Sequence, residues 1–245
     1  VFTWNGTTSG VCVPNGDWIP DNREGLTICD ATSAAFSMRL PWKKLDATTF
    51  SWQKVLGSEA QHGIIVLSPK VIHRLENFIP NRAIPKIFQL SNKGKVNKKL
   101  FTGSTINTPS MLCVEDAIDS LDWLESIGGL DGAIARSKKN LETVKDWVKN
   151  SNWADFLCED QNNLSSTSIC LKVTDKSFLS LNEDDQKSRI KEINNLLDKE
   201  QVAYDINSYR TAPPGFRIWG GSTVECSDIE NLLPWLDWAY AVVNA

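Results

Sequence analysis

An uninterrupted apolar run is the feature that most constrains the fold of this chain. Gly63 to Ser68 contains four consecutive large apolar side chains, which is typical of a strand covered on both faces. A proline-led helix is expected to follow from Pro69 to Phe78. Other short strands are expected at residues 1–4, 25–30 and 49–52. Strands that alternate with helices in this way predict an α/β fold.

The alternation continues after a helical pair. One helix is expected to start at Thr108-Pro109 and to end at Gly128-Gly129, and a second is expected from Leu130 to Asn150. The first of these helices has an apolar stripe made of Leu112, Ile118, Leu121 and Leu124. The pattern suggests that the helical pair connects two domains.

The last hundred residues predict a smaller α/β unit. A helix is expected to open at Asn182, with acidic residues in its first turn. A capping-box pattern at Ser227 to Glu230 predicts a final helix that ends near Val243. The strands expected around these helices lie at 153–158, 168–173, 202–206 and 215–219.

Composition excludes several classes of function. The 245 residues have a net charge of −4, so they show no signature of a nucleic-acid-binding protein. No apolar run is long enough to span a membrane and no signal peptide is visible, so we expect a cytoplasmic protein that binds neither nucleic acid nor membrane. The six cysteines are scattered and are expected to be reduced, and with two histidines no metal site is expected.

A single lysine follows the strand expected at 49–52. Lys54 has apolar or aromatic neighbours at Phe50, Trp52, Val55 and Leu56. Removal from water favours the neutral amine, which is the nucleophilic form. Most lysines are solvated surface charges, so Lys54 gains meaning only from the groups expected near it.

Three polar features complete a chemical pattern with Lys54. Asp30 ends the strand expected before it, and the carboxyl ends of strands in an α/β sheet are the usual place for ligands. The runs Asn5-Gly-Thr7 and Asn107-Thr108 are suited to holding a phosphate, although each also fits a plain turn or a helix cap. A strand-end Asp followed by a Lys suits pyridoxal phosphate, whose aldehyde needs an amine and whose pyridine nitrogen needs a carboxylate.

Five segments then resemble successive motifs of one family, the phosphoserine aminotransferases. They are Asn5-Gly-Thr7, Cys29-Asp-Ala-Thr-Ser33, Ser51-Trp-Gln-Lys-Val-Leu-Gly57, Ile106-Asn-Thr-Pro-Ser110 and Gly215-Phe-Arg-Ile-Trp219. The resemblance runs in order over essentially the whole chain. It implies the pyridoxal-phosphate transferase fold of type I, with residues 1–128 as the C-terminal part of the large cofactor-binding domain, whose sheet is mainly parallel. Residues 129–245 would form the small C-terminal α/β domain.

The resemblance also implies a cofactor site. Lys54 would hold pyridoxal phosphate covalently and move the proton between the substrate Cα and the cofactor. Asp30 would pair with the pyridinium, Thr7 would bond near the phenolic oxygen, and Gln53 would contact the phosphate. Asn107 and Thr108 would reach the cofactor phosphate of a second subunit, so that a homodimer shares its active sites.

A substrate site is implied as well. Arg217 would bind the substrate α-carboxylate with its two-pronged guanidinium, and Arg210 with Tyr209 would replace the His-Arg pair that the family uses for the substrate phosphate. The implied reaction transfers the amino group between L-glutamate and 3-phosphohydroxypyruvate, giving O-phospho-L-serine and 2-oxoglutarate in L-serine biosynthesis.

The resemblance leaves a part of the family's sequence without a counterpart. The family has a substantial section before the position of Val1, so we expect a chain truncated at its N-terminus. Two alternatives stay open. In the first alternative, the chain is another fold-type-I aminotransferase or a desulfurase-like enzyme. In the second, it is a truncated fragment without activity.

Overall fold

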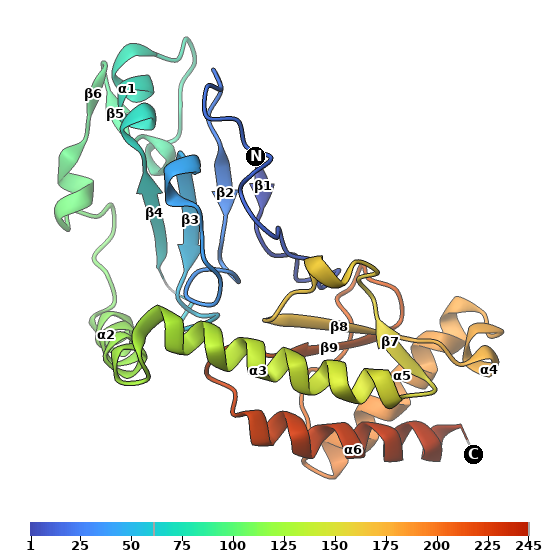
Figure 1. Cartoon of the computed structure of the whole chain (residues 1–245). Coiled ribbons are helices and arrows are strands. Elements are labelled where there is room, and N and C mark those ends of the chain that lie inside the picture. The colour runs from blue at the N-terminus through green and yellow to red at the C-terminus, as the bar shows by residue number, and fades with distance from the viewer. Residues whose placement is uncertain (61, 245) are drawn as a thin grey trace.

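Two sheets and one long helix organise the molecule. A computed structural model describes residues 1–60 and 62–244 (Figure 1). The upper part contains a four-stranded sheet, and the lower part contains a three-stranded sheet with two helices beside it. Helix α3, Gly129–Asn150, packs against α2, Met111–Ser126, at one end and runs along α6, Cys226–Val243. The division at residues 128 and 129 stays a prediction.

The upper sheet brings three strand ends to one edge. Its order is β1 (Phe2–Thr3), β2 (Ile28–Asp30), β3 (Ala47–Ser51) and β4 (Gly63–Leu67). The first three strands are parallel, and Asp30 is in register with Thr3 on one side and Thr49 on the other. The expectation of a mainly parallel sheet is confirmed, with β4 as an antiparallel exception.

Strand β4 differs from the expectation in its burial. Ile65 and Val66 keep 42% and 41% of their surface exposed, so the strand is not covered on both faces. The strand lies at the edge of the sheet and pairs only with β3, which leaves part of its apolar surface uncovered. Helix α1, Pro69–Asn77, follows as expected and starts where the Ser68 side chain accepts a hydrogen bond from the Val71 N–H.

The expected start of α2 is wrong by a few residues. Ser110, rather than Thr108, caps the helix, because the Ser110 hydroxyl accepts from the Cys113 N–H. The expected apolar stripe is buried only at Leu124, whereas Leu112 and Ile118 are 76% and 47% exposed. Between α1 and α2 lie a short hairpin, β5 (Ser91–Asn92) and β6 (Lys95–Val96), and two 3-10 turns, at Lys86–Phe88 and Lys98–Thr102.

The lower sheet is antiparallel and forms the larger core. Its order is β7 (Ala154–Phe156), β8 (Ser168–Val173) and β9 (Gly215–Trp219). Helices α5 (Glu183–Lys199) and α6 pack together, and Ile193, Leu197 and Leu236 are fully buried among the core residues. A short helix, α4 (Lys176–Leu179), precedes α5.

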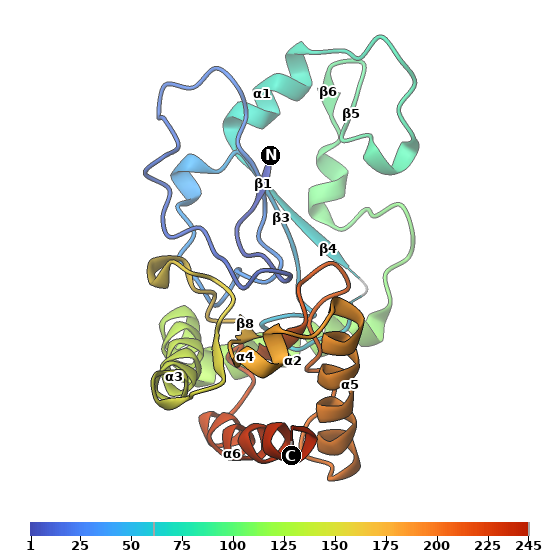
Figure 2. The same ribbon diagram turned by 90° about the vertical axis from the view of Figure 1, so that its right-hand side faces the viewer.

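Two expectations for this half are wrong. Residues 202–206 form a turn instead of a strand, because Gln201 and Asp205 adopt left-handed backbone angles that break an extended chain. The expected capping box does not form: α6 begins at Cys226, and Glu225 caps it without a side-chain hydrogen bond. Figure 2 shows the connection from α5 to β9 rising toward the upper sheet.

A buried network of polar side chains joins the upper sheet to the lower sheet. The Asn5 amide donates to Ser33 Oγ at 2.9 Å and to Thr167 Oγ1 at 3.0 Å. Thr167 in turn donates to the Ser33 carbonyl at 2.8 Å. All three residues are buried, so each broken bond would strand a polar group away from water. The network therefore fixes the turn after β1 against the start of β8.

Candidate active site

The lysine turn is anchored by its apolar neighbours. Strand β3 ends at Ser51 and the chain turns through Lys54, whose carbonyl accepts from the Gly57 N–H at 3.2 Å. Val55 and Leu56 are 2% and 5% exposed, and Leu56 packs in a small cluster with Leu124. The apolar flanks thus hold the backbone in place and leave the half-buried Lys54 side chain free to enter a pocket.

Gly57 ends this turn for a steric reason. Its φ of +72° lies in the left-handed region, and a Cβ there would come within 3.3 Å of the Thr223 side chain. The loop after β9 also contacts the turn through Ser222, whose hydroxyl donates to the Val55 carbonyl at 3.4 Å. The position of Lys54 therefore depends on a loop about 170 residues later in the chain.

A pocket of about 490 Å³ collects four of the residues expected from the sequence. Thr7, Gln53, Lys54 and Arg217 all line it, from the turn after β1, the lysine turn and strand β9. The pocket lies between the carboxyl edge of the upper sheet and the lower sheet. This edge is the usual ligand position in an α/β sheet.

Asp30 lies at the same edge but does not line the pocket. It is exposed at the end of β2, and its Oδ1 accepts from the Thr32 N–H at 2.9 Å and from the Thr32 hydroxyl at 2.7 Å. Asp30 therefore caps the turn that follows β2. A role for Asp30 toward a pyridinium stays a prediction.

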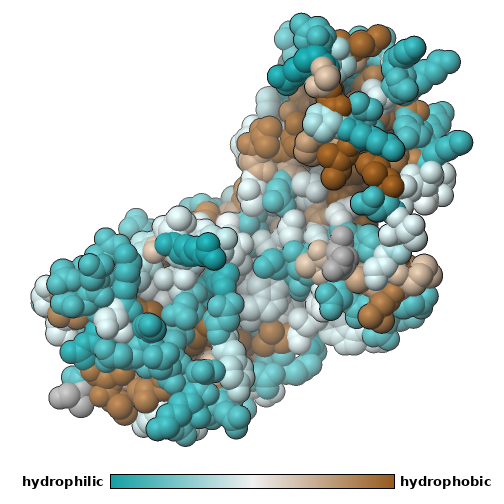
Figure 3. Space-filling view, turned by 180° about the vertical axis from the view of Figure 1, so that it is seen from behind, coloured by the Kyte–Doolittle hydropathy of each residue, from teal (hydrophilic) through white to brown (hydrophobic). Residues whose placement is uncertain are grey.

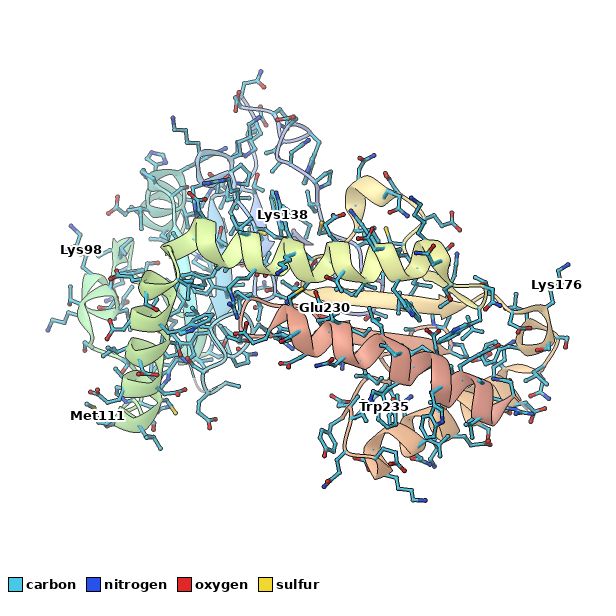
Figure 4. All side chains as sticks on the ribbon, turned by 60° about the horizontal axis from the view of Figure 1, so that its bottom comes forward. Lys98, Met111, Lys138, Lys176, Glu230 and Trp235 are labelled. Carbon is cyan, nitrogen blue, oxygen red and sulfur yellow. The ribbon has the colours of Figure 1, made fainter. Side chains whose placement is uncertain are left out.

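The remaining expected residues lie elsewhere. Asn107 and Thr108 are exposed on the segment before α2 and outside this pocket. Figure 4 shows Met111, the first residue of α2, at the far end of that helix from the rest of the molecule. Tyr209 and Arg210 line a separate cavity of about 200 Å³ formed by the loop before β9.

Arg217 lines the larger pocket and contacts Tyr209, which lines the smaller cavity. Its side chain is 21% exposed, and its Nη2 lies 3.5 Å from Asp205 Oδ2. Its guanidinium carbon lies 5.9 Å from the centre of the Tyr209 ring, within range of a cation–π contact. Tyr209 therefore faces Arg217, while Arg210 needs a movement of its loop to enter the larger pocket.

Sequence reasoning missed Trp219. The Lys54 Nζ lies over the Trp219 ring, 5.8 Å from its centre. A signal was present, because side chains two positions apart on a strand share a face, and both Arg217 and Trp219 line the pocket. Gly221 allows this placement, since a Cβ there would lie 2.6 Å from the Trp219 ring.

The thiols near the site are poor nucleophiles. Burial raises the pKa of Cys170 to about 11, although the Arg217 charge opposes the shift. Burial, with the charge of Asp30 adding to it, raises the pKa of Cys29 to about 11. Thiols of this kind stay protonated near neutral pH, which disfavours a desulfurase-like reaction at these two positions.

Residues 1–60 and 62–244 contain no group of three or more side chains that could hold a metal ion. None of the helices they form is both long and apolar enough to cross a membrane.

Two curated relatives of this chain have the same name. The chain is 55% identical over 244 residues to a protein of Methanosarcina barkeri named phosphoserine aminotransferase, and 54% identical to one of Methanosarcina mazei with the same name. These alignments cover 100% of this chain and 63% of each relative. No family model matches the chain.

Solved structures share the fold. A phosphoserine aminotransferase from Cytophaga hutchinsonii superposes with a TM-score of 0.77 at 21% identity, covering 97% of this chain and 62% of the other. An alanine–glyoxylate aminotransferase from a Nostoc species gives 0.72 at 14% identity, covering 97% and 60%. The expected fold, that of the type I pyridoxal-phosphate transferases, is therefore confirmed, as is the resemblance of the chain to the phosphoserine aminotransferases.

Proposed function

We propose that this chain, a relative of the phosphoserine aminotransferases, transfers the amino group between L-glutamate and 3-phosphohydroxypyruvate, giving O-phospho-L-serine and 2-oxoglutarate. The observation that carries the proposal is the convergence of Thr7, Gln53, Lys54 and Arg217 on one pocket. Three separate segments supply an amine, two polar groups and a guanidinium there. The chain spans about 63% of the length of the curated relatives that it matches.

The chemistry of the pocket fits pyridoxal phosphate. Within residues 1–60 and 62–244, the buried Gln53 amide oxygen has no hydrogen-bond partner, as expected of a group whose partner is a ligand. Amide O and N exchange places on a half-turn, so the same position can present an N–H to a phosphate oxygen. Lys54 supplies the amine, and Thr7, which lines the same pocket, supplies a hydroxyl. When bound, the cofactor supplies an electron sink for the bond broken at the substrate Cα.

Residues of this chain would hold the substrate and move the proton. Arg217 offers two parallel N–H donors to a carboxylate, which fixes the orientation of the Cα. Lys54 lies in the same pocket, where its amine can take a proton from the Cα and return it. Tyr209 and Arg210 line a separate cavity and would receive the substrate phosphate after their loop turned toward the larger pocket.

A cytoplasmic homodimer with shared sites completes the proposal. Asn107 and Thr108 are exposed and free to reach the cofactor phosphate of a second subunit. The segment between α1 and β5 exposes Phe78, Ile79, Ile87 and Phe88 by 58–70%. Figure 3 shows apolar surface gathered over this upper part of the molecule. Exposed apolar area of this kind supports an association surface.

Cofactor capture on Lys54 tests the proposal. The chain is mixed with pyridoxal phosphate, its visible absorption is recorded, borohydride is added, and peptides are mapped for the modified lysine. We expect modification at Lys54 and none in Lys54→Ala. Lys145→Ala is the matched control, because the half-buried Lys145 pairs with Glu142 and does not line this pocket. Absence of both the absorption band and the modification at Lys54 would refute the proposal.

Turnover tests the substrates. With L-glutamate and 3-phosphohydroxypyruvate we expect 2-oxoglutarate to form, and Lys54→Ala to lower kcat by about 10³-fold, the usual size of a lost general base. Lys145→Ala should retain the wild-type rate. A clear preference for an unphosphorylated keto acid would overturn the phosphoserine assignment.

A further inference from the structure

Arg217 already has a carboxylate beside it. Asp205 Oδ2 lies 3.5 Å from the Arg217 Nη2, and both residues line the pocket that contains Lys54. The α-carboxylate of an amino acid or a keto acid is the same chemical group as the side chain of Asp205. A guanidinium that donates hydrogen bonds to the Asp205 carboxylate can donate in the same way to a substrate carboxylate.

The backbone places Asp205 at this point with some strain. Its φ of +52° is left-handed, and Gln201, four residues earlier, has a φ of +58°. Asp and Asn tolerate this conformation better than other residues with a Cβ. The turn between these two positions forms a wall of the pocket, so the carboxylate is held at the rim.

The contact is weak enough to be displaced. The Asp205 side chain is 87% exposed, and ion pairs exposed to water are largely screened. The separation of 3.5 Å also exceeds that of a strong charge-assisted hydrogen bond. Arg217, in contrast, is held in place by strand β9 and by the Tyr209 ring, so it stays while its partner leaves.

We propose that Asp205 pairs with the Arg217 guanidinium and competes there with the carboxylate of an incoming substrate. Asp205 then helps to set the affinity for substrate. The pocket favours ligands whose anionic groups displace the Asp205 carboxylate from Arg217. The inference rests on the proposed role of Arg217 as the carboxylate receptor.

Binding of an unreactive dicarboxylate tests this competition. Glutarate is titrated into the full chain without cofactor, and its dissociation constant is measured by calorimetry for the wild type and for Asp205→Asn. Asparagine keeps the size of the side chain and tolerates the left-handed backbone. Removal of an exposed ion pair is expected to tighten binding by about two- to fivefold.

Two further variants separate competition from general charge. Asp228→Asn removes another carboxylate of the same pocket, and we expect it to change the affinity less than Asp205→Asn does. In Arg217→Lys, the gain from Asp205→Asn should disappear, because the fork for which both carboxylates compete is gone.

Several outcomes would overturn the inference. They are an unchanged or weaker affinity in Asp205→Asn, an equal gain in Asp228→Asn, a gain that persists in Arg217→Lys, and no glutarate binding by any variant. Glutarate binding requires neither cofactor nor turnover. A chain that fails to transaminate can therefore still support the competition, and an active chain can still refute it.

Discussion

Asn140 offers a sharp test of how the lysine turn is supported. Its side chain is 1% exposed on α3, and its amide donates to the carbonyls of Gly220, Gly221 and Val224 at 3.2, 3.4 and 3.0 Å. Figure 4 shows α3 and α6 side by side, and the loop that Asn140 holds leads into α6. The two N–H groups of the Asn140 amide are thus shared among three carbonyl oxygens around a buried side chain.

The loss of stability on removing the Asn140 amide follows from the number of carbonyls that lose their donor. Asn140→Ala removes the amide donor from the Gly220 and Val224 carbonyls, whereas the Gly221 carbonyl keeps the Val224 N–H. At about 1.5 kcal/mol for each of the two carbonyls, the free energy of unfolding should fall by about 3 kcal/mol. At the usual dependence on urea, this lowers the unfolding midpoint by about 1 M. Ser137→Ala is the matched control, because the buried Ser137 hydroxyl makes one bond, at 2.8 Å to Ser37.

Asn140→Asp distinguishes the hydrogen bonds from simple packing. The introduced carboxylate has the same shape but faces three carbonyl oxygens, so at pH 7 it should destabilise more than Asn140→Ala does. Burial raises the pKa of such a group, and its protonated form can donate, so the deficit should shrink as the pH falls. Urea unfolding at pH 7 and pH 5 measures both effects. A loss in Asn140→Ala no larger than in Ser137→Ala, or a pH-independent deficit in Asn140→Asp, would refute the reasoning.

Two further predictions concern other buried groups. Burial disfavours the Asp46 carboxylate, but hydrogen bonds from the Thr27 N–H and from Arg23, with the Arg23 charge, lower its pKa below the usual value. Its contribution to stability is present above the unfolded pKa of about 4 and is lost as the pH falls through the folded value, so Asp46→Asn should cost about 3 kcal/mol at pH 7 and progressively less below pH 4. A constant gap in thermal or urea unfolding between pH 7 and pH 3 would contradict this. Burial also raises the pKa of Cys12 and Cys29 from 9.0 to about 11, so at pH 8 a disulfide reagent should modify them about a hundredfold more slowly in the native chain than in urea. Equal rates in the two states would contradict their burial.

Much of the local structure could be predicted from the sequence because its causes lie within a few residues. Ser68-Pro69 and Asn182 start helices through hydrogen bonds that span three positions. Strands β3, β8 and β9 appear close to where their apolar patterns place them. The same local reasoning chose Thr108 instead of Ser110 as the cap of α2, since both have a hydroxyl near Pro109.

The sequence by itself determined which residues of this protein are chemically unusual: a lysine after a strand, an aspartate at a strand end and an arginine on a later strand. Only the tertiary structure decided that Lys54 lies over Trp219 and that Arg217 meets Asp205. These contacts depend on how the two sheets meet and on a turn with left-handed backbone. Neither contact can be predicted from neighbouring residues in the sequence. A sequence period of two or 3.6 residues shows which side chains share a face of a strand or helix, but not which other element that face will contact.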